Sequence, residues 1–418
     1  MTQTDDSYLI IGAGVFGAST ALHLIRKYPN SKIRLVDREP FPPQNAASWD
    51  LNKVVRADYD DIFYTEKALE AKELWRWDPL FKPFYHESGI FWISDAELAS
   101  KISDNYKKLN AKEDFRLVSL DEAKTAYDGM FEAADYSGVS QILINKSSGW
   151  AEAKEALKAT IQASVDAGVE YTATDIVGVE FDKNGACIGA RSKSEEMFRA
   201  RKTILCTGAG TARLLADSSP YREDIQVDGR LVAAGICTGF VELNDKLAEE
   251  FSKAPVGVQD LLPGRGGSLP PTVRHELKYW RDVSVRNSIK HASGQVFSAP
   301  PDKPLYDQWE VPQTLKDEVR YVSESLFGKR EDLKISNHRL CWESVTPSND
   351  FIISAHPRCA GLHVATGGSF HGWKFLPILG KYVLQMLDGT IDPALAKRWA
   401  WDRENLEPDL KDSFVAAA

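Results

Sequence analysis

The feature that most constrains this chain is a glycine-rich turn between two apolar runs near the N-terminus. The run Tyr8–Ile11 leads into Gly12–Gly17, which reads GAGVFG, and the helix-forming stretch Ala18–Lys27 follows. A second β-like run, Lys32–Val36, ends in Asp37. This order suits a pyrophosphate at the start of the helix and a ribose hydroxyl pair on the acid, so it predicts a dinucleotide site. The alternative is a coincidental glycine-rich turn, and the flanking strand, helix and acid argue against it.

Two later segments repeat the combination of an apolar run and a glycine-rich turn. Lys202–Cys206 leads into Thr207–Gly210, and Leu362–Ala365 leads into Thr366–Ser369, with alternating, strand-rich sequence between them. We therefore predict an α/β protein in which a Rossmann-like nucleotide domain is assembled from separated segments and an antiparallel-sheet substrate domain is inserted. The predicted division is 1–60, 149–225 and 335–418 for the nucleotide domain, and 61–148 and 226–334 for the substrate domain.

Composition narrows the class of protein. The chain has 418 residues, 43% hydrophobic and 27% charged, which is enough apolar material for large cores. Its net charge of -9 disfavours a nucleic-acid partner, and no apolar run approaches the roughly 18 residues of a membrane span. Five cysteines without CxxC spacing argue against a zinc site or a disulfide framework and fit a reducing compartment. With no signal-peptide pattern and no SKL-type ending, we expect a cytoplasmic protein.

Local patterns predict several further elements. Ile62–Trp77 has the spacing of an amphipathic helix, with Trp75 and Trp77 expected in the core. Lys101–Met130 is charged and is expected to be mostly helical. Gly149-Trp150 is expected to open another helix.

From the residues alone, the candidate site residues keep a structural alternative. Lys53 and Arg56, three apart in DLNKVVR, are either a binding pair or a solvated basic pair beside nearby aspartates. Cys341 would by default be an inert buried thiol, because most lone cysteines are. Lys278 would by default be a solvated strand lysine. The glycine-rich turn at Gly367 is by itself a weak signal for a bound anion or ring.

Motifs spread over nearly the whole chain resemble a known family. They are GAGVFG, DLNKVVR, DPLFKPFYHESG at Asp78–Gly89, SSGWAEA at Ser147–Ala153, ILCTGAG at Ile204–Gly210, ELK at Glu276–Lys278, CWESVTPSNDFIISAHP at Cys341–Pro357 and GGSFHGWKFLPILG at Gly367–Gly380. With these motifs the chain resembles the sarcosine oxidase-like flavoprotein amine oxidases. That group includes monomeric sarcosine oxidase, pipecolate and saccharopine oxidases, and the fungal fructosyl amino acid oxidases, or amadoriases.

The resemblance implies FAD as cofactor and a fold like that of glutathione reductase and D-amino acid oxidase. It implies that FAD contacts Gly12, Gly14, Val15, Phe16, Gly17, Asp37, Arg38, Ser48, Lys53, Val177, Gly208, Cys341, Gly367, Gly368, Gly372 and Lys374. It also implies that Cys341 bonds covalently to the flavin 8α-methyl carbon. A thiolate can attack that carbon because the oxidised ring makes it electrophilic.

The resemblance also assigns roles to charged residues. Lys278 falls at the lysine that faces the flavin and promotes its reaction with O2, since a fixed cation stabilises the charge that develops there. Lys374 and Arg56 fall at the partners of the substrate carboxylate, and Lys53 falls at a basic residue near the flavin. Glu343 stands where bacterial sarcosine oxidases carry tyrosine. We expect it to help choose the N-substituent, with pairing to Arg339 or another structural cation as the alternative.

These residues predict an FAD-dependent oxidase of secondary amino acids. A hydride is expected to leave the carbon next to the nitrogen for the flavin, and O2 then gives H2O2. The expected partners are a small amino-acid substrate and O2, acting on a monomer without nucleic acid, membrane or metal. Three alternatives stay open: a fructosyl amino acid oxidase, a nicotinamide-dependent dehydrogenase and a non-catalytic flavin-binding protein.

Overall fold

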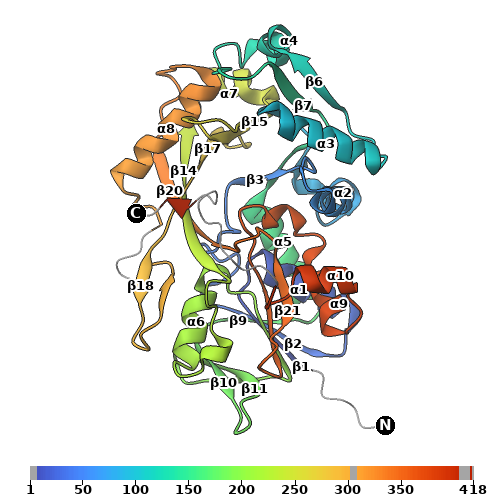
Figure 1. The fold of residues 1–418 in the computed structure, drawn as a ribbon, viewed down its shortest axis with the longest axis vertical. Helices are drawn as coiled ribbons and strands as arrows, with labels where there is room; N and C mark the ends of the chain where they lie inside the picture. The colour runs from blue at the N-terminus through green and yellow to red at the C-terminus, as the bar shows by residue number, and fades with distance from the viewer. Residues whose placement is uncertain (1–6, 302–307, 404–414, 417–418) are drawn as a thin grey trace.

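A six-stranded sheet forms the centre of the lower part of the molecule in Figure 1. The structure is a computed structural model that describes residues 7–301, 308–403 and 415–416. Five strands are parallel and the edge strand β21 is antiparallel. In spatial order they are β21 (Ile352–Ala355), β22 (Leu362–Thr366), β13 (Lys202–Leu205), β1 (Ser7–Ile11), β2 (Lys32–Asp37) and β9 (Glu170–Ala173).

Layers on both sides cover this sheet, so its strands are apolar on both faces. In β1, Tyr8 and Ile10 pack into one hydrophobic cluster, whereas Leu9 and Ile11 pack into another. This split follows the two-residue alternation of a strand. The first cluster contains residues of the helices α1 (Val15–Lys27), α5 (Ala153–Asp166) and α9 (Leu379–Leu387). The second contains residues of α6 (Thr211–Ser218) and of a sheet made of β10 (Ile176–Phe181), β11 (Cys187–Ser192) and β12 (Met197–Arg199).

A larger, mostly antiparallel sheet forms the upper part of the molecule (Figure 1). Its strands are β20 (Asn337–Val345), β14 (Val232–Glu242), β17 (Glu276–Val285), β16 (Gly266–Leu269), β15 (Val256–Gln259), β5 (Ile90–Ile93), β7 (Gln141–Asn145) and β6 (Phe115–Ser119), with β23 (Val415–Ala416) beside β17. Helix α8 (Gln313–Phe327) packs into the cluster on this sheet. The predicted fold class, a nucleotide-binding α/β part with an antiparallel sheet, is confirmed.

A third, small sheet connects the two parts. It consists of β3 (Asn52–Val55), β8 (Gly149–Glu152) and β4 (Tyr85–His86), all antiparallel. Gly149 was expected to open a helix, but it lies in β8, and α5 begins only at Ala153. A Cβ at Gly149 would lie 2.0 Å from the His86 carbonyl oxygen, so close approach of two strands accounts for this glycine.

Pairing with distant parts of the chain also changes the outcome of other local predictions. Helix α2 covers Ile62–Trp77 as predicted, and Trp75 is fully buried, but Trp77 ends the helix and is 68% exposed. The stretch expected to be mostly helical contains the strand β6, because β6 pairs with β7 from a later part of the chain. Strand β20, assigned from sequence to the nucleotide domain, pairs with β14 in the larger sheet. The exact domain division stays a prediction.

Two absences concern only the described residues. No helix there is long and apolar enough to cross a membrane. No group of three or more His, Cys, Asp or Glu side chains in those ranges is placed to hold a metal ion.

Candidate active site

The first glycine-rich turn is shaped by close backbone packing. Gly12 has φ +100°, and its N–H donates to the Val36 carbonyl over 2.7 Å. A Cβ at Gly12 would lie 2.4 Å from the Cys206 carbonyl oxygen, and one at Gly17 would lie 1.8 Å from the Gly12 oxygen. The turn therefore depends on glycine at both positions, and α1 starts directly against the end of β1.

A cavity of about 640 Å³ lies along this turn. Its lining includes most of the residues predicted to contact the cofactor, namely Gly12, Gly14, Val15, Phe16, Asp37, Arg38, Ser48, Gly208 and Gly368. The predicted residues Gly17, Val177, Gly367 and Gly372 do not line it. Gly17 and Gly367 instead pack against neighbouring residues. Val177 lies on β10, next to the lining residue Ile176.

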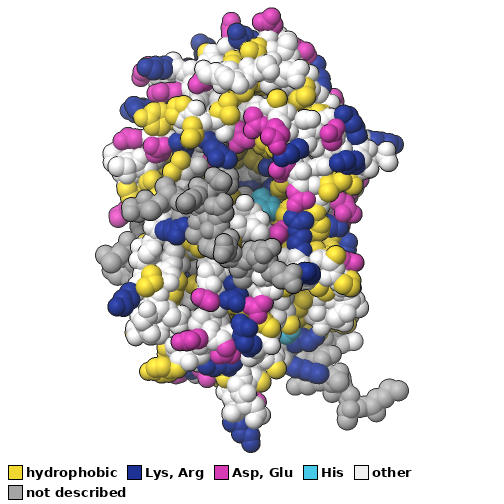
Figure 2. All heavy atoms as spheres, viewed as in Figure 1, with side chains coloured by type: hydrophobic (Ala, Val, Ile, Leu, Met, Phe, Trp, Pro, Cys, Tyr) yellow, Lys and Arg dark blue, Asp and Glu magenta, His cyan; other side chains and the backbone are white. Residues whose placement is uncertain are grey.

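A second cavity, of about 490 Å³, adjoins the first. Glu343 and Trp373 line both cavities. All six charged or nucleophilic candidates line the second one: Lys53, Arg56, Lys278, Cys341, Glu343 and Lys374. Figure 2 shows the face of the molecule on which a hollow opens near the middle of its long axis, with charged side chains around it.

Two of these lysines share one buried carboxylate. The Asp50 Oδ2 atom lies 2.6 Å from Lys278 Nζ and 3.0 Å from Lys53 Nζ. Lys278 also donates to the Asn52 carbonyl over 2.9 Å. Lys278 is 3% exposed and the Asp50 side chain 1% exposed. Asp50 therefore fixes both ammonium groups at the wall of the cavity.

Burial and mutual charge set the protonation of this group. Burial lowers the pKa of Lys278 to about 8, against the attraction of Asp50. Burial would also lower the pKa of Lys53, but the charges of Asp50, Cys341 and Glu343 outweigh it and raise that pKa to about 12. Burial would raise the pKa of Asp50, yet the two lysines hold it well below its usual range. Asp50 is thus ionised, and Lys278 titrates near physiological pH.

Lys374 has a different environment, with neutral partners. Its Nζ donates to the Tyr59 hydroxyl and to the His371 carbonyl, each over 2.9 Å. Its own carbonyl accepts from Trp75 Nε1 over 2.7 Å, and the Trp75 ring stacks on Trp373 at 5.2 Å. Burial and the nearby charge of Arg56 hold the pKa of Lys374 well below its usual value.

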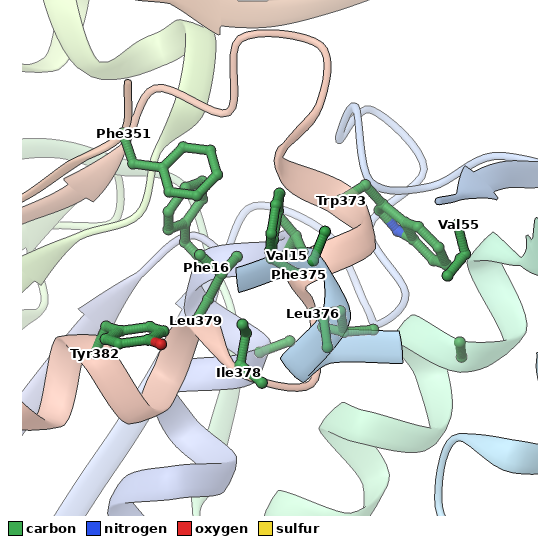
Figure 3. Close-up of a cluster of buried hydrophobic side chains, with 14 of the residues drawn as sticks. Val15, Phe16, Val55, Phe351, Trp373, Phe375, Leu376, Ile378, Leu379 and Tyr382 are labelled. Atoms are coloured by element: carbon green, nitrogen blue, oxygen red, sulfur yellow. The ribbon is translucent and has the colours of Figure 1, made fainter. Parts of the chain in front are cut away.

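An apolar cluster fixes the segment that carries Lys374. The short 3-10 helix Gly372–Phe375 and the start of α9 pack against Val15 and Phe16 at the start of α1 (Figure 3). Phe351 lies on the same cluster, with its ring 5.6 Å from that of Phe16. The same packing therefore positions both the glycine-rich turn at Gly12 and Lys374.

Arg56 is held between two aromatic rings. Its guanidinium lies 4.6 Å from the ring centroids of both Tyr59 and Trp92, and it donates to the Asp58 carbonyl. Lys53 and Arg56 both line the cavity and are partly exposed, so the choice between a binding pair and a solvated pair stays a prediction. Cation–π contacts of this kind keep a guanidinium in place while leaving its charge available.

Glu343 is paired with the backbone rather than with Arg339. Its Oε2 accepts from the Phe370 N–H over 2.7 Å, and burial raises its pKa. Arg339 instead donates to Gln308 and to the carbonyls of Gln44, Ala46 and Trp49. The specific pairing of Glu343 with Arg339 is therefore wrong.

Cys341 is a buried thiol at the wall of the second cavity. It is 5% exposed, and its Sγ lies 3.8 Å from the Ala47 carbonyl. Burial raises its pKa, while the charges of Arg339 and Lys53 act in the opposite direction. Of the other cysteines, only Cys206 lines a described cavity, the first one.

A comparison with known proteins identifies the family. The model of the family described as "DAO: FAD dependent oxidoreductase" matches residues 7–386. The chain belongs to this family. It is 25% identical over 426 residues to L-saccharopine oxidase of Schizosaccharomyces pombe, covering 96% of this chain and 94% of that protein. It is 22% identical over 399 residues to monomeric sarcosine oxidase of an Arthrobacter species, covering 92% of each.

Solved structures agree on the fold. Fructosyl peptide oxidase from E. terrenum superposes with a TM-score of 0.84 at 22% identity, over 100% of this chain and 97% of that one. Amadoriase II from Aspergillus fumigatus in complex with FSA gives 0.81 at 24% identity, over 99% and 92%. The predicted family and fold are confirmed, and the protein is an FAD-dependent oxidoreductase.

The residues of this DAO-family chain fit FAD. The first cavity is lined at the start of α1 by Gly14, Val15 and Phe16. The first turn of α1 carries no acidic side chain. Its backbone N–H groups and helix dipole therefore favour a pyrophosphate. At Gly208 a Cβ would meet no atom within 4 Å, so open space remains beside this turn. The second cavity, of about 490 Å³, adjoins the first at Glu343 and Trp373.

Several residues of the site were missed by sequence reasoning. Asp50 had a signal, because it lies three residues before Lys53 within the motif that carried the resemblance. His371 had the same kind of signal, three residues before Lys374 in the motif at Gly367–Gly380. Tyr59 had none, since its contacts with Lys374 and His371 exist only in the folded chain. Asp260 and Asp282 also line the second cavity, and burial raises the pKa of Asp282 to about 6.

Proposed function

We propose that this protein is an FAD-dependent oxidase of secondary amino acids. The observation that carries the proposal is the second cavity, where Lys374 and Arg56 lie at the wall beside Cys341 and Lys278. When bound, FAD supplies the acceptor for the hydride and passes the electrons to O2, which leaves as H2O2. The named activities of the relatives, saccharopine and sarcosine oxidation, support this class of reaction.

In this proposal Lys374 and Arg56 bind the substrate carboxylate. The ammonium group of Lys374 supplies a point charge, and the guanidinium of Arg56 supplies a planar fork of donors. Arg56 is already oriented by Tyr59 and Trp92, so it loses little freedom on binding. Two cations in a largely buried cavity favour an anionic group, and a free carboxylate is the simplest one.

Lys278 acts in the proposal on the reaction with O2. Asp50 and the Asn52 carbonyl hold its ammonium group in place before the reaction starts. A preorganised cation stabilises the negative charge that develops on O2 and needs no reorganisation at that moment. Lys53, held by the same carboxylate, adds positive potential at the same cavity wall.

Cys341 is proposed to hold the flavin covalently. Its thiol lies in the cavity with Lys53, whose charge favours the thiolate needed for attack. If FAD makes the contacts with the glycine-rich turns that the resemblance implies, its flavin ring would lie in the second cavity, beside Cys341. The alternative cysteine, Cys206, has its pKa raised far by burial and lies on the nucleotide side.

The acidic side chains favour an extended N-substituent over the methyl group of sarcosine. Glu343 is fixed by the Phe370 N–H, while Asp260 and Asp282 lie on the strand-lined wall. Carboxylates of this kind accept hydrogen bonds from a second ammonium group or from sugar hydroxyls. Substrates of saccharopine type and fructosyl amino acids both meet this requirement, so fructosyl oxidation remains the second candidate.

An anaerobic screen tests the proposal. Purified holoprotein is mixed with L-saccharopine, L-pipecolate, sarcosine and a fructosyl amino acid, and the flavin absorbance is followed before O2 is admitted. We expect bleaching by a secondary amino acid, and one H2O2 per amine after O2 returns. A colourless protein would indicate nicotinamide chemistry. A yellow protein that none of the four amines bleaches would contradict the oxidase.

Further parts of the proposal concern the state of the protein. We propose that it acts as a monomer, as the names of the monomeric sarcosine oxidases state for those relatives. The five cysteines are all free and buried, which fits the reducing cytoplasm. Gel filtration with light scattering and fractionation of the source cells test these two points.

A further inference from the structure

We propose that Lys374, Tyr59 and His371 form a relay that removes the proton from the ammonium group of the substrate before oxidation. The inference rests on the proposed function, because it assumes a secondary amine that arrives protonated. Amines of this kind have a pKa near that of lysine, about 10.4, so they enter as ammonium ions at neutral pH. An ammonium nitrogen has no lone pair to assist hydride loss, and the proton must leave first.

The geometry of the three groups defines one direction of donation. His371 Nε2 lies 2.8 Å from the Asn349 carbonyl, which can only accept, so this nitrogen carries the proton. His371 Nδ1 is then an acceptor, and the Tyr59 hydroxyl donates to it over 3.2 Å. The Tyr59 oxygen in turn accepts from Lys374 Nζ over 2.9 Å. The assignment leaves no donor facing a donor.

The relay leads from the buried cavity wall towards solvent. Lys374 is 6% exposed and lines the cavity. His371 is partly exposed, and Asn349 beyond it is exposed. A proton given to Lys374 therefore has a path out that avoids the site where the amine must stay neutral.

The charged groups around Lys374 make it a proton acceptor. Arg56 and Lys53, from β3 and the turn after it, disfavour its charged form, whereas Asp58 and Glu343 favour it. In the described part of the chain no carboxylate forms an ion pair with Lys374, unlike Lys278. Burial and Arg56 dominate and hold the pKa of Lys374 well below its usual value.

The surroundings of the other two groups keep them neutral between transfers. His371 faces the cations Lys374, Arg56 and Arg398, and burial with these charges lowers its pKa to about 3. Burial raises the pKa of Tyr59 well above its ordinary value. The histidine therefore holds a proton only briefly, and the tyrosine stays a phenol.

The proton balance is simple. An N–H bond of the substrate breaks and a bond to Lys374 Nζ forms, which leaves a neutral amine and a lysine ammonium group beside the carboxylate. Lys374 then gives a proton to the Tyr59 oxygen while Tyr59 gives its own to His371 Nδ1, so no phenolate accumulates. The resulting imidazolium releases its Nε2 proton to water, and proton exchange with water then restores the starting tautomer. No electrons move in these steps.

The variants His371→Gln and Tyr59→Phe test the relay. Glutamine keeps a hydrogen-bonding side chain but cannot carry a proton through, and phenylalanine keeps the ring. Anaerobic bleaching of the holoprotein by L-saccharopine, L-pipecolate and sarcosine is measured from neutral pH to about pH 10, where free amine is abundant. We expect a rate about 100-fold lower at neutral pH, with rates that approach those of the wild type at the alkaline end.

A matched control and a second readout separate the relay from a structural role. His363→Gln changes a buried histidine on β22 that lines neither cavity, and it should leave the pH profile unchanged. In parallel, lysine labelled with 13C at Cε is titrated by NMR, with Lys374→Met identifying the Lys374 signal. We expect Lys374 to titrate well below an ordinary lysine and to take up a proton when propanoate, a carboxylate without an amine, is added.

Three outcomes would overturn the relay. A loss of the same size at every pH would indicate a structural role, and unchanged rates in both variants would show that the path is not used. An ordinary titration of Lys374 would remove the acceptor, whatever the amines do. If none of the three amines bleaches the flavin although Lys374 titrates well below an ordinary lysine, the proposed function is wrong. The relay then has no substrate proton to remove.

Discussion

Replacing Asp50 with asparagine would separate the charge of Lys278 from its position. The Asp50 Oδ2 atom is shared by Lys278 at 2.6 Å and Lys53 at 3.0 Å, all in the wall of the second cavity. Asparagine keeps the shape of the side chain and an oxygen that accepts hydrogen bonds. Asp50→Asn therefore removes the negative charge while leaving most of the packing.

The size of the effect follows from the geometry. Two unit charges 2.6 Å apart attract by about 6 kcal/mol at an effective dielectric constant of about 20, and breaking a buried pair costs about 3–5 kcal/mol. The cost of breaking the pair, divided between the two lysines, is about 2 kcal/mol for each, which corresponds to about 1.5 pKa units. The pKa of Lys278 would fall from about 8 to about 6.5.

A lysine is charged below its pKa, so a lower pKa reduces the charged fraction of Lys278 at a given pH. At pH of about 7.5 the charged fraction of Lys278 would fall from roughly three quarters to roughly a tenth. If this charge promotes the reaction with O2, reoxidation in the wild type declines as pH rises through about 8. In Asp50→Asn the same decline moves to lower pH. Stopped-flow mixing of the reduced holoprotein with O2 over a pH series measures both curves.

Glu113→Gln provides the matched control. Glu113 forms a buried pair with Lys72, and neither residue lines a described cavity. This variant should lower the free energy of unfolding but keep the pH dependence of reoxidation. Identical pH curves for Asp50→Asn and the wild type would refute the reasoning, as would an effect confined to amine oxidation.

Four further predictions use the same holoprotein. Cys341→Ser should release FAD on denaturation, whereas the wild-type chain should keep one FAD in its intact mass. Arg56→Ala or Lys374→Ala should cost about 2–5 kcal/mol of binding, measured as a larger loss on amino acids than on plain amines. Glu343→Gln should change the ranking of N-substituents, and an unchanged ranking would remove its proposed role. Gly12→Ala should prevent FAD uptake, because the new Cβ would lie 2.4 Å from the Cys206 carbonyl oxygen, and the recovered flavin-to-protein ratio measures this.

The nucleotide half could be predicted from sequence because its signals are local. The strand, the glycine turn, the helix and the terminal acid lie within 30 consecutive residues, Tyr8–Asp37. The close backbone packing at this turn tolerates few side chains, because a Cβ at Gly17 would lie 1.8 Å from the Gly12 oxygen. A pattern with so few tolerated residues carries much structural information.

The substrate side could be predicted only as a set of residues, not as a network. The structure brings the six candidates into one cavity, while their roles stay predictions. The contacts that organise them join residues far apart: Lys278 and Asp50 are 228 positions apart, and Lys374 and Tyr59 are 315 apart. Neither spacing nor periodicity reports on such pairs. The helix expected at Gly149 failed for the same reason, since its strand exists only between β3 and β4.

The two buried lysines have different partners, and these partners suit the two different tasks proposed for them. Lys278 is anchored by the Asp50 carboxylate and the Asn52 carbonyl, and the attraction of Asp50 helps to keep its charge up to pH of about 8, against burial and the repulsion of Lys53. Lys374 is held by a phenol and a carbonyl, beside the cation Arg56, so its charged form is disfavoured until an anion arrives. A substrate carboxylate is such an anion, and the amine it carries is the nearest source of a proton. The same binding event would therefore pass the amine's proton to Lys374, which hands it on through Tyr59 and His371 and leaves the neutral amine that oxidation requires.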